Sequence, residues 1–209
     1  SYVEGAVVAV EALLLIGFAI PGYCTVKYDK IIDTSSDEIE VRVIAQQFAW
    51  NIHYPGLDGK FGITRANLVN EEVNPIGLDR EGSGADDIVT LNQLHLPVDK
   101  LIKIYISSKD VIHGFSLPEM RVKQDAVPGM QIPVYFTPTM TTNEFLQKMK
   151  GTSRENMGYE IACAQLCGNS HYRMKGYMTI HNEDEYNQWL LDEAELLDSE
   201  GDDEWDDEW

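Results

Sequence analysis

The chain has 209 residues, the size of one ordinary domain with attachments rather than two domains. It carries 16 basic and 35 acidic residues, and the formal net charge of −19 argues against binding to nucleic-acid phosphates. The stretch from Glu183 to Glu208 is rich in acids and contains no Lys or Arg, so basic partners fit better. Three cysteines are too few and too unevenly placed for a disulfide framework, which leaves a metal site as the stronger interpretation.

The segment Gly5–Val26 is long and apolar, with Glu11 as its single charge. As a helix it spans roughly 30 Å, the thickness of the hydrocarbon core of a bilayer. No basic residues precede it and no small-x-small cleavage site follows it, which favours a transmembrane helix over a secretory signal peptide. Pro21 and Gly22 lie where a helix leaving the bilayer can stop. We therefore predict one transmembrane helix within residues 1–30.

After Asp33, short runs of β-branched and aromatic residues alternate with turn clusters such as Pro55-Gly56 and Pro128-Gly129. No long helical period interrupts them. The pattern predicts a mainly β domain over residues 31–182, either an antiparallel sandwich or a Greek-key barrel, with residues 64–87 as an irregular excursion. The expected strands are Ile39–Tyr54, Ile88–Leu94, Leu101–Ser107, Gln131–Phe136 and Tyr177–His181.

From Glu183 onward, apolar residues recur at helical spacing and carboxylates occupy the other positions. We expect this acidic helix to pack on the domain surface. The last nine residues combine two tryptophans with six acids and cannot bury enough apolar surface to become ordered. Residues 183–209 are thus predicted to form a short acidic helix and a disordered tail, and docking of this tail on a basic neighbour is the functional alternative. The apolar stripe consists of Tyr186, Trp189, Leu190, Ala194 and Leu197.

The strongest chemical signal is the loop Cys163-Ala-Gln-Leu-Cys167-Gly-Asn-Ser-His171-Tyr-Arg-Met174. Two thiolates, an imidazole and a thioether match the ligand preferences of copper, whereas zinc sites more often use Cys-x-x-Cys pairs and no methionine. A single blue-copper ion needs only one cysteine, so two cysteines indicate thiolates that bridge two copper ions. Gly168 can relieve the bend of such a loop. A disulfide between the cysteines would leave His171 and Met174 without a role.

A second imidazole is required, and the chain offers four histidines outside the loop: His53, His95, His113 and His181. His113 is the best placed of these. It lies in Asp110-Val-Ile-His-Gly-Phe-Ser-Leu-Pro118, where it follows two apolar β-branched residues and precedes a glycine-aromatic pair.

On these motifs the chain resembles subunit II of a haem–copper cytochrome c oxidase, from its second transmembrane helix through its copper A domain. The resemblance covers roughly residues 1–182. It implies a cupredoxin-like Greek-key β-barrel outside the membrane, in a bacterial periplasm or a mitochondrial intermembrane space. The carrying motifs are the Cys163–Met174 loop, Asp110-Val-Ile-His113, Val122-Lys-Gln-Asp-Ala-Val-Pro-Gly129 and Gln46-Gln-Phe-Ala-Trp50.

The resemblance also implies the function and its partners. Such a subunit accepts electrons from cytochrome c at a dinuclear copper A centre and passes them to haem in subunit I, within an oxygen-reducing, proton-translocating oxidoreductase of the respiratory chain. By the same resemblance, Cys163 and Cys167 bridge both copper ions. His113 and Met174 complete one ion, and His171 and the backbone carbonyl of Gln165 complete the other.

Further roles follow from the resemblance alone. Phe48 and Trp50 lie in the segment that matches the family's aromatic electron-input patch, and which of the two rings mediates transfer stays open. Glu4, seventeen residues before Pro21, resembles the acid at the mouth of the family's proton channel. Many family members have Glu at the position of Gln165, where it also binds magnesium; a neutral amide is a poorer ligand for this hard cation, so magnesium stays open.

The family's first transmembrane helix is not part of the given sequence, and we expect it on another chain or outside these residues. No Cys-x-x-Cys-His motif occurs, so a separate cytochrome c is the expected donor. One alternative is a copper A domain of the nitrous oxide reductase type, which has a similar loop but lacks the membrane helix and the Gln46–Trp50 segment. The other is a metal-free docking subunit, against which the full set of ligand types argues.

Overall fold

The computed structural model describes residues 1–25 and 38–201. The chain divides into two compact units, Ser1–Glu38 and Ile39–Trp209, which are described separately. The predicted boundary near residue 30 and residues 202–209 of the predicted disordered tail lie outside the described residues, so both stay predictions; Gly201, the first residue of that predicted tail, ends a helix.

The first unit is helical from Tyr2 to Thr25, and it is long and apolar enough to cross a membrane. It consists of α1 (Tyr2–Leu14), a π-helical stretch (Leu15–Ala19) and a last segment that reaches Thr25. None of its described side chains is buried within the unit, although its apolar residues dominate. An apolar helix whose side chains are not buried within its own unit is suited to a lipid environment, as the sequence predicts.

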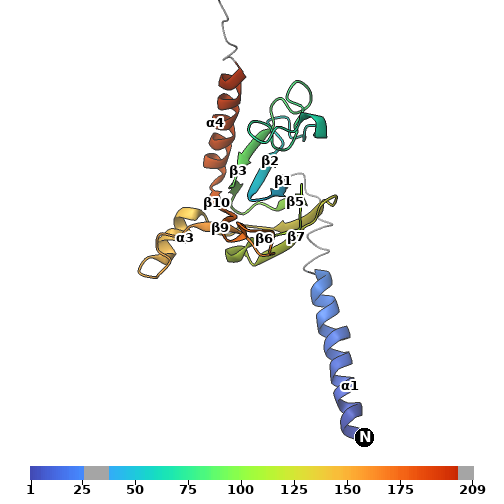
Figure 1. Ribbon diagram of the computed structural model, residues 1–209. Helices are drawn as coiled ribbons and strands as arrows, with labels where there is room; N and C mark the ends of the chain where they lie inside the picture. The colour runs from blue at the N-terminus through green and yellow to red at the C-terminus, as the bar shows by residue number, and fades with distance from the viewer. Residues whose placement is uncertain (26–37, 202–209) are drawn as a thin grey trace, which may run out of the picture. The chain divides into compact units, whose positions relative to one another are not determined.

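The second unit is built from two five-stranded sheets, which confirms the mainly β, cupredoxin-like prediction (Figure 1). The first sheet has the order β3-β2-β1-β5-β8 and the second has the order β4-β10-β9-β6-β7. The strands of the first sheet are β3 (Ile88–Leu91), β2 (Ala49–Tyr54), β1 (Ile39–Gln46), β5 (Ile102–Ser108) and β8 (Ile132–Phe136). Those of the second are β4 (Gln93–Pro97), β10 (Lys175–His181), β9 (Tyr159–Cys163), β6 (His113–Leu117) and β7 (Val122–Ala126).

Two strand pairs are parallel, so of the two predicted architectures the purely antiparallel sandwich does not apply. β1 pairs with β5 in parallel, and β10 pairs with β4 in parallel. Between β1 and β5 the chain passes through β4 in the other sheet, so it returns beside β1 in the same direction. Local turn signals in a sequence do not reveal such a crossover.

Two expected strands are each divided by a turn. The run Ile39–Tyr54 turns at Gln47-Phe48 and forms the antiparallel pair β1 and β2. The run Ile88–Leu94 breaks at Asn92, whose φ of 59° lies in the left-handed region that asparagine tolerates better than most residues. This break sends β3 into the first sheet and β4 into the second.

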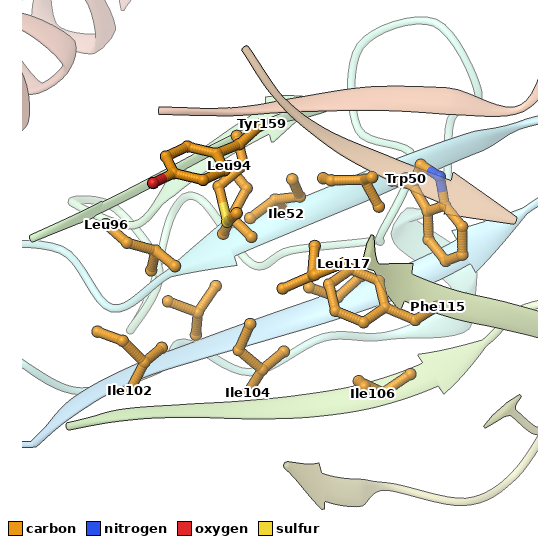
Figure 2. Packing of buried hydrophobic residues seen from close by; sticks show 14 of the residues in the cluster. Trp50, Ile52, Leu94, Leu96, Ile102, Ile104, Ile106, Phe115, Leu117 and Tyr159 are labelled. Carbon is orange, nitrogen blue, oxygen red and sulfur yellow. The ribbon is translucent and has the colours of Figure 1, made fainter. Parts of the chain in front are cut away.

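Alternate residues of both sheets form the core between them (Figure 2). In β1, Val41, Val43 and Ala45 are buried while the residues between them are partly exposed, the period of two expected for a strand. The ring of Trp50 packs edge-on against Phe115, with the ring centroids 5.4 Å apart, and so joins the two sheets. Burial of these large side chains is the main favourable contribution to folding of the domain.

Residues 64–87 form the predicted irregular excursion, with one short 3-10 helix (Ala66–Leu68) and two isolated β-bridges. The helix α3 (Thr142–Met149) was not predicted. Its signal is the capping box of Thr141 and Glu144, in which the Glu144 carboxylate accepts the backbone N–H of Thr141 at 2.9 Å.

The acidic C-terminal helix α4 (Glu183–Gly201) packs on the domain as predicted. Tyr186 is buried, and the ring of Trp189 stacks on His95 with centroids 4.4 Å apart. His95 Nδ1 lies 2.8 Å from His181 Nε2, so one imidazole donates a hydrogen bond to the other between neighbouring strands.

This packing makes the domain sensitive to acid. Burial, reinforced by the neighbouring His181, lowers the pKa of His95 to about 4. In the unfolded chain His95 takes up its proton near its ordinary pKa of about 6.5. Between these values the unfolded state binds more protons, so the free energy of unfolding should fall as the pH falls from about 6.5 to 4.

Urea unfolding of the full chain in detergent, followed by tryptophan fluorescence at pH 7.5 and at pH 5, measures this loss. A His95→Phe variant keeps a ring against Trp189 without a titrating group and should lose less stability between the two pH values. An unchanged pH dependence in this variant would rule out His95 as a source of the acid sensitivity.

Candidate metal centre

The donor atoms predicted from the sequence converge at one end of β6 and β9. The Sγ atoms of Cys163 and Cys167 lie 3.8 Å apart, and both cysteines are free thiols. Cys163 Sγ lies 4.0 Å from His113 Nδ1, and Cys167 Sγ lies 3.6 Å from His171 Nδ1. The ligand atoms of His113 and the two cysteines all lie within 4.8 Å of one another.

The two weaker donors complete the cluster. Met174 Sδ lies 3.8 Å from Cys167 Sγ, and the carbonyl oxygen of Gln165 lies 3.2 Å from Cys163 Sγ. Met174 is 1% exposed, so its thioether faces the cluster and the protein interior rather than water. All six donor groups named from the sequence are therefore brought together by the fold.

The spacing of these atoms fits a shared metal better than a disulfide. A disulfide needs sulfur atoms about 2.05 Å apart. Two ligands that share one tetrahedral ion at roughly 2.0–2.3 Å lie roughly 3.3–3.8 Å from each other. The separations of 3.6 and 3.8 Å at Cys167 fall in this range. A soft donor set of two sulfur anions, a thioether and two imidazoles suits copper.

Asp110 holds His113 in the tautomer that a metal requires. The Asp110 carboxylate lies 2.8 Å from His113 Nε2 and also accepts the backbone N–H of Gln47 at 2.7 Å. Burial would raise the pKa of Asp110, but these hydrogen bonds outweigh it and lower that pKa. The ionised carboxylate accepts a hydrogen bond from the Nε2–H of His113, so the lone pair of Nδ1 points toward Cys163.

Two glycines allow the loop to pass close to its neighbours. A Cβ on Gly114 would lie 2.8 Å from the backbone nitrogen of Gln165, so β6 must have glycine where the loop crosses it. Gly168 has a φ of +145°, and a Cβ there would lie 3.1 Å from the ring of Phe48. Gln47 fixes the same turn, since its Nε2 donates to the carbonyl oxygen of Cys167 at 2.5 Å.

Three residues of this site were not predicted to have a role: Asp110, Gln47 and Gly114. Asp110 and Gln47 lie inside motifs that carry the resemblance, and Gly114 directly follows His113. The spacing of Asp110 three residues before His113 is the signal that could have identified it, because metal-binding histidines are commonly oriented by a carboxylate. The roles of Gln47 and Gly114 depend on a crossing between distant segments and have no local signal.

Without a metal, Cys167 is a weak acid. Burial, together with the neighbouring Cys163 thiol, raises the pKa of Cys167 to about 11. Metal binding must therefore displace protons from the thiols, as it does at other cysteine sites.

The other residues predicted as functional are placed differently. Trp50 is fully buried and contacts His113 edge-on, with ring centroids 6.2 Å apart, whereas Phe48 is partly exposed in the turn before β2. The two rings do not lie on one strand face, because Phe48 is in the turn and Trp50 is in β2. The side chain of Gln165 is exposed, and Glu4 lies in the first turn of α1 in the other unit.

The remaining histidines take no part in this cluster. His53 pairs with Asp87 in the other sheet, and His95 pairs with His181 under α4. The structure therefore selects His113 from the four candidates.

Comparison with known proteins now bears on this geometry. Residues 39–181 match the family model described as the periplasmic domain of cytochrome c oxidase subunit II. This match covers more than half of the chain. The chain belongs to the cytochrome c oxidase subunit II family. The resemblance stated from the sequence is thereby confirmed.

Two relatives show how far the likeness within the family extends. The chain is 34% identical over 188 residues to the alternative cytochrome c oxidase subunit 2 of Bradyrhizobium diazoefficiens, an alignment that covers 89% of this chain and 60% of the relative. It is 25% identical over 179 residues to the cytochrome c oxidase subunit 2 of Thermostichus vulcanus, covering 86% and 41%. The chain thus spans between two fifths and three fifths of the length of these relatives.

Solved structures support the fold. The periplasmic domain of cytochrome oxidase subunit II from Bradyrhizobium japonicum matches with a TM-score of 0.52 at 22% identity, over 78% of this chain and 98% of that one. A chain of a heme-copper terminal oxidase dimer matches with a TM-score of 0.50 at 16% identity, over 87% and 100%.

The contact between Asp110 and His113 yields a prediction. Asp110→Asn keeps the shape of the side chain but removes the ionised acceptor of the His113 proton, so copper affinity should fall roughly 10- to 100-fold. Competition with a copper chelator measures the affinity. Asp125→Asn, on the exposed face of β7, is the matched control and should bind copper as the wild type does. Equal copper affinities in the two variants would contradict the orienting role of Asp110.

Proposed function

We propose that this chain is the electron-accepting subunit of a haem–copper terminal oxidase, with a dinuclear copper A centre held by the Cys163–Met174 loop and His113. The observation that carries the proposal is the convergence of six donor groups around two free thiols 3.8 Å apart. Two copper ions bridged by these thiolates would take up and release one electron at a time, with little change in geometry.

The distances support the assignment of each ligand. His113 lies on the Cys163 side of the cluster and Met174 on the Cys167 side, so an ion between the two sulfurs is within reach of both. His171 lies on the Cys167 side and the Gln165 carbonyl on the Cys163 side, which suits a second bridged ion. The thioether and the carbonyl are weak ligands and would tune the reduction potential more than the affinity.

Phe48 is the better candidate for electron input. Its ring packs directly against Gly168, next to Cys167, and it is partly exposed. Trp50 has no exposed surface and supports His113 and Phe115 from the core. A donor protein can therefore touch Phe48 but not Trp50, and the proposed order of contact is donor, Phe48, Cys167 loop.

The charge of the chain favours a basic donor such as a lysine-rich cytochrome c. At a net charge of −19 the protein attracts cations over distances limited by the Debye length, about 10 Å at 0.1 M salt. Such attraction speeds encounter more than it strengthens the final complex. The acidic helix α4 adds to this field with carboxylates along its exposed positions.

The apolar helix Tyr2–Thr25 would anchor the subunit in the membrane beside subunit I and other oxidase subunits, in contact with lipid. In this arrangement the copper domain faces the bacterial periplasm or the mitochondrial intermembrane space, and haem in subunit I receives the electrons that drive oxygen reduction and proton pumping. Glu4 is proposed as the proton-input acid near one end of the helix. The same helix disfavours the nitrous oxide reductase type, which lacks it, and the complete donor set disfavours a metal-free docking subunit.

Stopped-flow mixing of the oxidised, copper-loaded full chain in detergent with reduced cytochrome c tests the proposal. The wild type should oxidise cytochrome c in a bimolecular reaction that slows as salt is added. Phe48→Ala should slow it at least about tenfold with unchanged copper content, because it removes the ring between the surface and the Cys167 turn.

Tyr177→Ala is the control for Phe48→Ala, because Tyr177 is an aromatic residue 64% exposed on β10, where it is paired with Glu160 of β9. It should react at the wild-type rate. Equal rates for all three proteins would remove Phe48 from the route, whereas no oxidation of cytochrome c by the copper-loaded wild type would contradict the proposed function itself.

A further inference from the structure

The two cysteines of the proposed copper centre are held in different ways. Cys163 is the last residue of β9, where it pairs with Phe115 of β6, the strand that begins with His113. Cys167 lies beyond the end of β9, in the ligand loop Cys163–Met174. The sheet therefore positions the Cys163 side of the centre directly, whereas the Cys167 side needs an anchor of another kind.

One side chain supplies this anchor. Among the hydrogen bonds of the described residues, a single one ties residues 165–173 to a segment outside the ligand loop: Gln47 Nε2 donates to the Cys167 carbonyl oxygen at 2.5 Å. The other hydrogen bonds of this stretch stay within the loop, such as that from the His171 N–H to the Gly168 carbonyl at 3.1 Å. The place of Cys167 relative to the sheets thus depends on the Gln47 amide.

Packing confines the Gln47 amide to this contact. Gly168 directly follows Cys167, and a Cβ built on it would lie 2.7 Å from Gln47 Nε2 and 3.1 Å from the ring of Phe48. The amide and the ring therefore both lie against the backbone of the loop, in space that only a glycine leaves open.

Gln47 also reaches the His113 side of the centre. Its backbone N–H donates to one carboxylate oxygen of Asp110 at 2.7 Å, and the other oxygen lies 2.8 Å from His113 Nε2. The turn between β1 and β2 is therefore tied both to the segment that carries His113 and to the loop that carries Cys167.

We propose that Gln47 is a positioning residue for the copper centre: its side-chain amide holds Cys167 where both copper ions share one electron, and its N–H dipole favours the reduced centre. This inference rests on the proposed function, because it concerns the same site. It adds a residue that is not a ligand and that sets how evenly the electron is shared and how readily it is accepted.

Loss of the anchor would act on the two ions unequally. Cys163 keeps its strand pairing without Gln47. Cys167 and His171, whose Sγ and Nδ1 atoms lie 3.6 Å apart, would instead shift together with the loop. The two ions would then have unmatched surroundings, and the electron would reside more on one ion than on the other.

The direction of the N–H bond gives the sign of the effect on the reduction potential. The reduced centre carries one electron more than the oxidised centre, and the positive end of the Gln47 N–H bond points at the loop that carries this charge. A hydrogen-bond donor placed there stabilises the reduced form and so raises the reduction potential.

Gln47→Met and Gln47→Glu separate this role from a purely structural one. Methionine has a similar length but no donor, and glutamate keeps the shape but puts an anion against the Cys167 carbonyl. Gln47 is exposed in its turn, so neither change removes a core side chain.

Gln147→Met and Gln147→Glu are the matched controls. Gln147 is exposed on α3, and Phe145 of the same helix stacks on Tyr159 with ring centroids 4.4 Å apart. Tyr159 begins β9 and Cys163 ends it, so these variants make the same replacements at the opposite end of the strand.

Electron paramagnetic resonance and a redox titration of the copper-loaded full chain in detergent measure both effects. In Gln47→Met the hyperfine pattern should change toward a localised electron, and the equilibrium constant for reduction should fall at least about twofold. In Gln47→Glu this constant should fall further, at least about fivefold, because the dipole is replaced by a full negative charge. Both Gln147 variants should match the wild type.

Three results would overturn the proposal: wild-type spectra and potentials in both Gln47 variants, equal potentials in Gln47→Met and Gln47→Glu, or changes as large in the Gln147 variants. Copper content and circular dichroism are measured on the same samples. A folded Gln47 variant that holds fewer than two copper ions, while the Gln147 variants hold two, would support the anchoring role.

Failure of this inference is distinguishable from failure of the proposed function. A wild type without a delocalised signal would contradict the proposed function itself, and the role of Gln47 with it. A delocalised wild type with unchanged Gln47 variants would contradict the role of Gln47 alone.

Discussion

The separation of 3.8 Å between the two free thiols of Cys163 and Cys167 is the constraint on which the rest of the domain depends. As thiolates, two sulfur atoms this close would repel one another unless metal cations lay between them. The fold holds them there all the same. Cys163 ends β9, where it is paired with Phe115 of β6, and Cys167 is buried in the turn that Gln47 fixes from the other sheet.

Rigidity around these thiols serves the proposed function. A centre that gains and loses an electron works best when its ligands do not move between the two states, and here the ligands are fixed by strands, by two glycine crossings and by a carboxylate. Trp50 contributes from the core, since its buried ring contacts both His113 and Phe115. The packing of Trp50 that stabilises the sandwich thus also positions the proposed ligand His113. This role accounts for the burial of Trp50 in the core, where an electron-donor protein cannot touch it.

The ligand loop could be predicted from the sequence because its donors are close together in the chain and their chemistry is distinctive. His113 could be chosen only through its motif, and the structure supports the choice by placing the other three candidates with Asp87 or under α4. The mainly β class followed from residue composition and turns. The parallel pairs of β1 with β5 and of β10 with β4 did not, because they depend on a crossover between sheets.

Electron paramagnetic resonance with copper quantitation, on the oxidised, copper-loaded full chain in detergent, tests the central claim most directly. The account predicts two copper ions per chain that share one unpaired electron, seen as a delocalised signal, and loss of that signal in Cys167→Ser. A four-line signal from a single copper ion, or an unchanged spectrum in Cys167→Ser, would contradict the assignment of both cysteines as bridging ligands.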